Sequence, residues 1–579
     1  MNDSTKKPII NCHAHIFKGE HVPPYLAKTF VPWPFYRLLN TPLILKLYKR
    51  SVKDNNEKYQ DPYVEKKRNK VIRRIKLQRN KLLNGILSLI GFIVTYHTLF
   101  IIFEWLSLVF SPENNDVIKY GLLLQEWLES IYLLYPLKNI FIKTALVAIL
   151  VLFFKSGRNL IWFILRKTLK FFSVLPGKMT KDLLDRYLLL GRFTLYKDQK
   201  RIFSVLESQY PPGSKFIVLP MDMEYMGAGK LDAKSSYKHQ MQEIASIKEK
   251  GKYKNEILPF VFAEPRRIRE EKDHLKFTFD KGKVTLQDCF IKEYIEDKKF
   301  NGFKIYPALG YYPFDEALLP LWKYAADRGI PIMTHCIKGT IFYRGKKEKE
   351  WDVHPIFKEV VNLENDIYEP LLLPQTKNKD FSLNFTHPLN YLVLLKEELL
   401  RILVDQCSDE IKSLFGYKDL NTPLTYNLSH LKICFAHFGG EDQWNKYLEF
   451  DRYRYSNELI KEPETGINFL YRLDNKFSWK KLEDCWKYVD WYSIICSMML
   501  QHENVYADIS YILHDEQIFP LLRQTINHTK LGKKVLFGTD FYVVRNHAAE
   551  KNLVAATTGN LTVEEFDIIA RDNPAKFLS

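Results

Sequence analysis

The stretch Pro8-Ile9-Ile10-Asn11-Cys12-His13-Ala14-His15 places an apolar run directly before two histidines that are one residue apart. Along a β-strand, residues i and i+2 point to the same face, so His13 and His15 are expected side by side at a strand end. Imidazole binds zinc, iron, nickel and copper, which makes the pair a candidate half of a metal site. A structural or solvated role is the alternative, and later strand ends must supply further ligands for the metal hypothesis to hold.

Seven further β-rich runs follow much later in the chain, each ending in polar residues. They span residues 216–222, 257–262, 302–306, 330–335, 431–437, 505–510 and 534–540. Helical or loop stretches separate them, and residues 314–328 show a helical apolar pattern closed by a glycine and a proline. Eight strands in this alternation predict a closed parallel (β/α)8 barrel, the TIM barrel.

In such a barrel the C-terminal ends of the strands surround one site, so the polar residues there become neighbours. They are His13, His15, Asp222, Glu264, Lys304, His335, His437, Asp508 and Asp540. Taken singly, His335 fits a core histidine and Asp540 a helix cap. Histidines ending strands one, five and six, with an aspartate ending strand eight, together indicate a metal set.

These strand ends resemble those of the amidohydrolase superfamily, close to its amidohydrolase-related branch with amino-carboxymuconate semialdehyde decarboxylase-like enzymes. The resemblance covers residues 1–20 and 210–579 and includes the chain's ending, residues 572–578. The matching motifs are Asn11-Cys12-His13-Ala14-His15, Gly302-Phe303-Lys304-Ile305-Tyr306-Pro307, Pro331-Ile332-Met333-Thr334-His335, Phe435-Ala436-His437-Phe438-Gly439-Gly440, Val505-Tyr506-Ala507-Asp508 and Gly538-Thr539-Asp540-Phe541. The family's usual Asp-x-His-x-His has asparagine here at Asn11, which weakens a carboxylate role at that position.

The resemblance implies that one or two divalent ions, zinc first among them, are held at this site. The implied ligands of the first ion are His13, His15, His335 and Asp540. His437 is implied as a ligand of a second ion or as a general acid/base. Lys304 stands where some superfamily members carry a carboxylated lysine that bridges two metals; a cation facing an anionic substrate and a packed structural lysine are the alternatives.

The implied reaction is hydrolysis of an amide, ester or lactone of a small molecule by water that the metal activates. Asp540 would accept the proton of that water and return it to the leaving group, and His437 would polarise the scissile carbonyl. Metal-assisted decarboxylation is an alternative on the same residues. The candidate substrate contacts, for which packing or helix-end charge are equal alternatives, are Tyr306, Tyr311, Tyr312, Arg266 and Arg267.

The net charge of +17 is concentrated in two short stretches. Residues 66–81 hold nine Lys/Arg and no acid, and residues 155–170 hold five and no acid, which leaves +3 for the rest of the chain. Because these stretches flank apolar segments, anionic lipid is a better partner for them than nucleic acid. Seven scattered cysteines without CxxC pairs indicate a reducing compartment and no disulfide framework.

Between the basic stretches, residues 82–103 form a run of 22 residues without formal charge. About 20 such residues span a bilayer as a helix. A second apolar stretch, at about 137–156, is interrupted by Lys143. Since strands one and two belong to one barrel, the chain must cross an even number of times, which favours a hairpin with spans at 82–104 and 137–156. The positive flanks place both ends, and the barrel, in the cytoplasm.

The sequence therefore predicts a membrane-anchored metallohydrolase. Residues 1–20 form its first strand, 21–205 an insertion and 206–579 the remaining barrel. The insertion contacts membrane lipid, and homo-oligomerisation is left open. A non-catalytic membrane scaffold that keeps the barrel for binding is the alternative from another class, and four or five intact ligands at strand ends argue against it.

Overall fold

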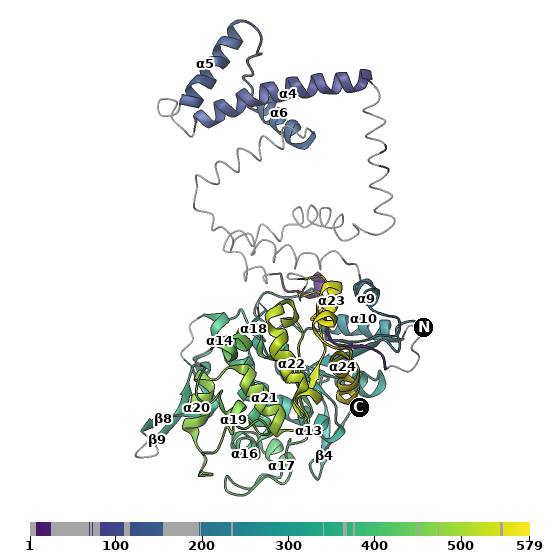
Figure 1. Cartoon of the computed structure of the whole chain (residues 1–579), viewed down its shortest axis with the longest axis vertical. Coiled ribbons are helices and arrows are strands. Elements are labelled where there is room, and N and C mark those ends of the chain that lie inside the picture. The colour runs from purple at the N-terminus through teal and green to yellow at the C-terminus, as the bar shows by residue number, and fades with distance from the viewer. Residues whose placement is uncertain are drawn as a thin grey trace. The chain divides into compact units, whose positions relative to one another are not determined.

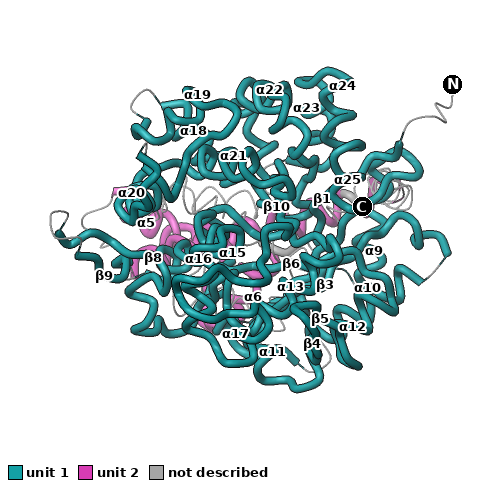
Figure 2. The backbone as a smooth tube through the Cα atoms, turned by 90° about the horizontal axis from the view of Figure 1, so that it is seen from below, with its two compact units in different colours: residues 1–49, 185–579 teal, residues 50–184 magenta. Residues whose placement is uncertain are grey.

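The computed structural model describes residues 7–24, 69, 72, 81–108, 116–153, 196 and 198–579. Short gaps fall at 233–235, 250, 340, 363–366, 374–376, 450–451, 473 and 545–547. These residues form two compact units, one from residues 1–49 with 185–579 and the other from residues 50–184 (Figure 2). Each unit is described separately below.

The larger unit is a barrel of eight parallel strands, as the eight runs predict. Figure 1 labels many of the helices that belong to this unit. In spatial order the strands are β1 (Ile10–Ala14), β2 (Lys215–Val218), β3 (Ile257–Phe262), β6 (Gly302–Lys304), β7 (Ile332–His335), β10 (Ile433–Ala436), β11 (Val505–Asp508) and β12 (Val535–Leu536). The ring closes between its first and last strands, where Cys12 N donates to Phe537 O at 2.8 Å and Asp540 N to His13 O at 2.9 Å. Chain order and spatial order agree, as in a TIM barrel.

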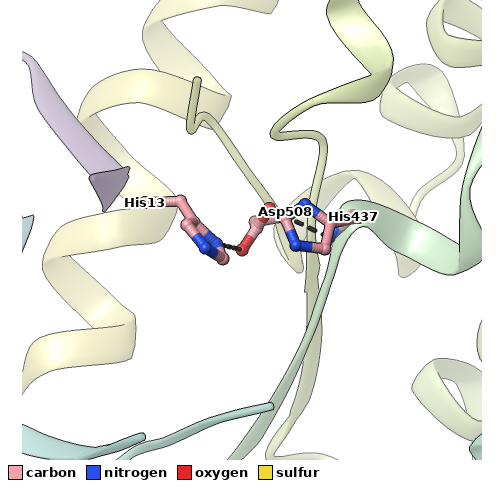
Figure 3. A group of neighbouring side chains, drawn as sticks. All are labelled: His13, His437 and Asp508. Carbon is pink, nitrogen blue, oxygen red and sulfur yellow. Dashed lines mark hydrogen bonds and ion pairs between the residues drawn. The ribbon is translucent and has the colours of Figure 1, made fainter. Parts of the chain in front are cut away.

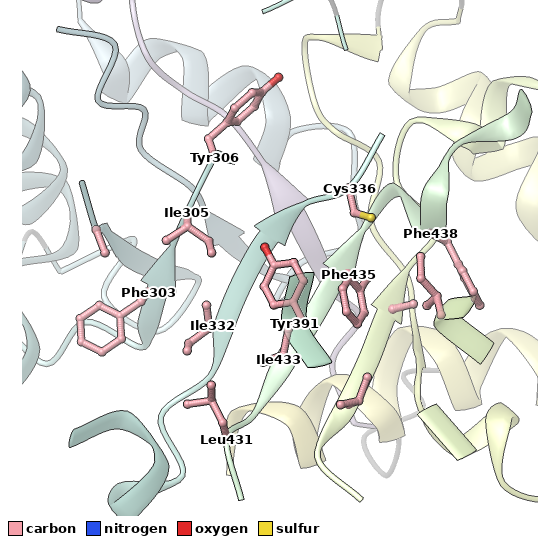
Figure 4. Packing of buried hydrophobic residues seen from close by; sticks show 14 of the residues in the cluster. Phe303, Ile305, Tyr306, Ile332, Cys336, Tyr391, Leu431, Ile433, Phe435 and Phe438 are labelled. Carbon is pink, nitrogen blue, oxygen red and sulfur yellow. The ribbon is translucent and has the colours of Figure 1, made fainter. Parts of the chain in front are cut away.

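Apolar side chains fill the barrel and also cover its outside. Inside, Ile10, Ile217, Phe260, Met333 and Leu536 belong to one buried cluster. The alternate residues of the same strands face outward, and Figure 4 shows those of β6, β7 and β10 in one buried cluster with Tyr391. A strand buried on both faces needs a continuous apolar run, which explains why these segments do not alternate with polar residues.

Helices and two antiparallel hairpins connect the strands. The expected helix at 314–328 forms as a short 3-10 turn, Glu316–Leu318, and α13 (Leu319–Arg328), which ends at Gly329 with φ 66°. The hairpins are β4–β5 (Phe277–Asp280, Lys283–Leu286) and β8–β9 (Val353–Asn362, Ile367–Leu372). The other helices are α9 (Gln199–Glu207), α10 (Tyr237–Glu249), α11 (Pro265–Glu270), α12 (Phe290–Lys292), α14 (Asn378–Thr386), α15 (Leu392–Leu395), α16 (Glu397–Asp405), α17 (Asp409–Phe415), α18 (Glu441–Leu448), α19 (Glu458–Lys461), α20 (Trp479–Tyr488), α21 (Trp491–Gln501), α22 (Phe519–Asn527), α23 (Glu550–Asn560), α24 (Val563–Asp567) and α25 (Asn573–Leu578).

The smaller unit is helical, with α4 (Lys81–Ser107) in contact with both α5 (Asp116–Ser130) and α6 (Ile140–Phe153). Lys143 of α6 donates to Glu104 of α4, with Nζ 2.6 Å from Oε2. This ion pair accounts for the charge that interrupts the second apolar stretch. Among the described residues, α4 alone is long and apolar enough to cross a membrane by length and composition. With 14 described residues, α6 is shorter than a span of about 20.

Candidate metal centre

The two histidines of β1 reach the site through an irregularity in that strand. The register of β1 with β2 shifts between Asn11 and Ala14, which marks a β-bulge. Cys12 lies in the cluster inside the barrel, while His13 and His15 contact each other at the C-terminal end. Strict alternation would point neighbours Cys12 and His13 to opposite faces, and a bulge re-aims a side chain in this way.

A hydrogen bond at Nδ1 of each imidazole determines which ring nitrogen carries the proton. His13 Nδ1 lies 3.0 Å from Asp508 Oδ2, and His15 Nδ1 lies 2.8 Å from the Leu219 carbonyl oxygen. A carboxylate and a carbonyl only accept, so each Nδ1 carries the proton and each Nε2 has a free lone pair. The two Nε2 atoms face each other at 3.3 Å.

Asp540, directly after β12, adds an oxygen to this pair. Its Oδ1 lies 3.4 Å from His15 Nε2 and 3.7 Å from His13 Nε2, and it is buried without a hydrogen-bond partner among the described residues. A tetrahedral zinc with bonds of about 2.0–2.1 Å separates its ligand atoms by about 3.3–3.4 Å. The three electron-rich atoms of His13, His15 and Asp540 are thus spaced as the ligands of one divalent ion.

A second pair of nitrogens lies beside the first group. His437 Nε2 lies 3.1 Å from His335 Nδ1, and His437 Nδ1 lies 2.9 Å from Ser510 Oγ and 3.3 Å from the Ser510 carbonyl oxygen. Because that carbonyl only accepts, Nδ1 of His437 carries its proton, and the lone pair on Nε2 faces His335 Nδ1. His335, expected beside His13 and His15, therefore faces His437 in this arrangement.

Asp508 connects the two groups (Figure 3). It accepts from His13 Nδ1 through Oδ2 and from the backbone N–H of His437 through Oδ1, and Ser510 Oγ also donates to Oδ1. Hydrogen bonds to the far nitrogen of a metal-binding histidine set its tautomer and orientation. The sequence places Asp508 at a strand end but does not predict this role. It does not predict Ser510 either, and the one signal that could have found Ser510 is its i+2 position after Asp508.

Lys304 ends β6, and within the described part of the chain its Nζ is fully buried and without a hydrogen-bond partner. Burial lowers the pKa of Lys304 to about 8, against the opposing effect of Asp508 and Asp540. Burial likewise raises the pKa of Asp540 to about 8, although the Lys304 cation acts in the other direction. An amine that loses its proton this readily is able to serve either as a cation or as a neutral nucleophile.

All four site histidines are held in the neutral form that metal binding requires. Burial is the main cause, and it lowers the pKa of His15 to about 3. The pKa values of His13, His335 and His437 also lie well below the usual 6.5.

Backbone geometry is unusual at the same place. His437 and Asp540 adopt φ of 66° and 58°, in the left-handed region that non-glycine residues rarely occupy. Such conformations cost about 1–3 kcal/mol each and gather at functional sites. At Gly538 a side chain is excluded, because a Cβ there would lie 2.9 Å from that of His13.

The candidate substrate contacts lie at this end of the barrel in different settings. Tyr306 stacks on the His335 ring, with centroids 3.8 Å apart. The Tyr311 hydroxyl accepts from Tyr306 N at 2.9 Å. Tyr312 packs against Phe385 and His354, and its hydroxyl has no partner. Arg266 grips Glu264 through Nε and Nη2, so its charge is balanced within the protein. Arg267 is paired with Asp222.

A further group of potential ligands, His21, His239 and Glu243, is less suited to a metal. His21 Nδ1 accepts from the backbone N–H of Lys18 at 3.1 Å, which leaves the proton of the neutral ring on Nε2. The Lys18 ammonium also lies 3.2 Å from Glu243 Oε2 and already balances that carboxylate.

Asn11, where the family pattern has aspartate, holds the ends of β1 and β12 together. Its Oδ1 accepts from the backbone N–H groups of His13 and Thr539, at 3.1 and 3.3 Å. Its Nδ2 donates to Tyr210 and Thr539 and lies 3.4 Å from Glu550 Oε1. The surroundings of residue 11 thus suit an amide side chain, which can donate and accept hydrogen bonds at the same time.

We expect Asn11→Asp to destabilise the protein by about 1–3 kcal/mol, because it removes a buried donor and sets a second carboxylate against Glu550. Thermal denaturation followed by circular dichroism measures the change. Adding Glu550→Gln to Asn11→Asp is expected to recover part of the loss. An Asn11→Asp protein as stable as the wild type would show that the amide donor is dispensable.

Comparison with known proteins finds similarity only among solved structures. No family model matches the chain, and no curated protein sequence matches it. Similar structures include an uncharacterised TIM-barrel protein of Bordetella bronchiseptica, at 10% identity, covering 68% of this chain and 88% of that one, with a TM-score of 0.31. An amidohydrolase of Mycobacterium avium subsp. paratuberculosis is 13% identical, with 66% and 75% covered and a TM-score of 0.27. A candidate amidohydrolase of Staphylococcus aureus is 13% identical, with 63% and 86% covered and a TM-score of 0.29.

Fold and site together define the class of this chain, a (β/α)8-barrel protein with a candidate metal centre at the C-terminal ends of its strands.

Proposed function

We propose that this chain is a metal-dependent hydrolase of the amidohydrolase kind, which cleaves an amide, ester or lactone bond of a small molecule with water. The observation that carries the proposal is the convergence of three candidate ligand atoms, His13 Nε2, His15 Nε2 and Asp540 Oδ1, at 3.3 to 3.7 Å from one another. Two imidazole lone pairs and a carboxyl oxygen that face one another in a buried place are costly, and a divalent ion that replaces the carboxyl proton relieves that cost.

Zinc suits this donor set best, since imidazole and carboxylate with an open position are typical of catalytic zinc. His13, His15 and Asp540 would hold the first ion, and His335 Nδ1 with His437 Nε2 would hold a second. Lys304 would either join the two as a carboxylated ligand or stay a cation facing the substrate. A bound divalent ion polarises the scissile carbonyl and makes water a nucleophile at neutral pH.

The chain's own residues supply proton handling and orientation. The carboxyl of Asp540 takes the proton of the attacking water and later gives it to the leaving group, since its Oδ1 faces the place where the ion and its water would lie. His437 has its proton on Nδ1, toward Ser510, so its Nε2 acts as a ligand or base and does not donate to a carbonyl. Asp508 keeps His13 in the tautomer that binds metal.

Metal removal tests the proposal. The full-length chain, purified in detergent, is expected to contain about one or two zinc ions by elemental analysis and to hydrolyse some members of a panel of nitrophenyl esters, N-acyl amino acids and lactones. Treatment with dipicolinate should lower the rate at least about 100-fold, and added zinc should restore it. Activity that survives complete metal removal would contradict the proposal.

We also propose that the smaller unit attaches the enzyme to a membrane from the cytoplasmic side. Support comes from the 27 residues of α4, whose apolar side chains are largely exposed, and from the Lys143–Glu104 pair, which leaves α6 without an unbalanced charge. The basic stretches at 66–81 and 155–170 lie outside the described residues except for Asn69, Ile72 and Lys81, and their contact with anionic lipid stays a prediction.

A further inference from the structure

One arginine at the substrate end of the barrel has a buried, unused hydrogen-bonding edge. Arg344 is partly buried, and its Nε and Nη2 are inaccessible to solvent and without a hydrogen-bond partner. Its guanidinium carbon lies 3.7 Å from the centre of the Phe342 ring. Burial alone lowers the pKa of Arg344, to about 10, and no carboxylate counteracts it. Among the described residues its charge therefore lacks a counterion.

The neighbouring arginines show what this edge does elsewhere in the same molecule. Arg266 uses Nε and Nη2 to grip both oxygens of Glu264, at 2.7 and 2.9 Å. Arg267 uses the same two atoms to grip Asp222, at 2.6 and 3.0 Å. Two parallel N–H groups match the two oxygens of one carboxylate. In Arg344 the equivalent pair of donors is buried and has no partner among the residues that the structure describes.

Backbone contacts place Arg344 at the C-terminal end of the barrel. Its segment follows directly after β7, which ends at His335, and a Cβ at Gly339 of this segment would lie 2.9 Å from His335 Nε2. Arg344 N donates to Met226 O at 2.6 Å, and Tyr343 N donates to Ala308 O at 2.8 Å. Met226 and Ala308 belong to the connections that leave the C-terminal ends of β2 and β6.

The segment is also held firmly. Asn378 Nδ2 donates to the carbonyl oxygens of Tyr343 and Gly345, at 3.2 and 2.9 Å. Gly227, with φ of 71°, packs so closely that a Cβ there would lie 2.4 Å from Gly345 N. A charged side chain on a fixed backbone loses little entropy when it binds a ligand.

We propose that Arg344 binds a carboxylate group of the substrate and so makes this site selective for anionic molecules. A single guanidinium edge balances one carboxylate, whereas a phosphate dianion calls for more donors. That the bound carboxylate belongs to a substrate rests on the proposed hydrolase function. Binding of the carboxylate itself needs neither metal nor catalysis. A buried cation without a partner costs free energy, which an incoming carboxylate offsets.

Ligand-dependent melting of the full-length, metal-free chain tests the proposal. The probe is sodium benzoate, with benzamide at equal ionic strength as its uncharged counterpart. Benzoate is expected to raise the melting temperature of the wild type and benzamide to leave it unchanged. Arg344→Met should weaken benzoate binding at least about tenfold, and Arg344→Lys, which keeps the charge without the paired donors, should weaken it in part.

A matched variant separates binding from structural damage. Arg344→Met is expected to melt no lower than the wild type when no anion is present, whereas Arg266→Met, which strands the buried Glu264, should melt lower. Equal benzoate stabilisation in the wild type and Arg344→Met, or none in the wild type, would overturn the proposal. Because benzoate binding is measured on metal-free protein, this test of Arg344 stays valid even if the hydrolase assay fails.

Discussion

Asp540→Asn and His15→Ala are each expected to lower kcat/KM by about 1,000-fold or more and to reduce the zinc content of the purified protein. Asp540 offers a buried oxygen without any other partner, and His15 Nε2 lies 3.4 Å from it. Removing either leaves two ligand atoms where a catalytic zinc needs three. Elemental analysis and steady-state kinetics on the same preparation measure both effects.

Asp508→Asn provides a graded control for this prediction. It keeps all three ligand atoms but weakens the hydrogen bond that holds the proton on Nδ1 of His13. Loss of such an outer partner typically costs about 10–100-fold in metal affinity or activity. Zinc at high concentration should therefore rescue Asp508→Asn but not His15→Ala. Full zinc content and activity in Asp540→Asn would mean that this aspartate is not a ligand.

The barrel was predictable because its signals are local. Each strand is an apolar run buried on both faces, and each ends at a polar residue, so the order of runs such as 330–335 and 431–437 already implies the ring. The common position of His13, His335, His437 and Asp540 at strand ends follows from that topology alone. The hairpin β8–β9 and the exact helix ends depend on tertiary packing, which a run of residues does not encode.

The grouping of the ligands was beyond the sequence. Which nitrogen of His15 is free depends on the Leu219 carbonyl, about 200 residues away in the chain, and the direction of His13 depends on a bulge in β1. His335 and His437 share a type and a position with His13, so only coordinates show that they face each other. Arg344 lies in a loop without a motif. Only the structure shows that its Nε and Nη2 lack the carboxylate partner that the same atoms have in Arg266 and Arg267.

In the smaller unit, the first half of α4 carries apolar residues that the described part of the chain leaves exposed. Leu82, Leu89 and Phe92 are 78%, 60% and 67% exposed within the described structure. Each such side chain gains about 1.5–3 kcal/mol when it leaves water. A soluble protein seldom leaves so much apolar surface uncovered, and a bilayer is the environment that covers a single helix along its length.

We therefore expect Leu89→Arg with Phe92→Arg to move the full-length chain out of the membrane fraction. An arginine at the centre of a span costs about 2.5–3.5 kcal/mol on insertion scales, so two of them oppose insertion by about 5–7 kcal/mol. Fractionation with carbonate extraction, followed by blotting, measures the shift. The matched control is Tyr120→Arg with Trp127→Arg, two equally exposed positions on α5 in the predicted outer loop, which should stay in the membrane fraction. Wild-type protein recovered wholly soluble without detergent would contradict membrane attachment. That result would not bear on the metal centre of the barrel, which the zinc measurements test independently.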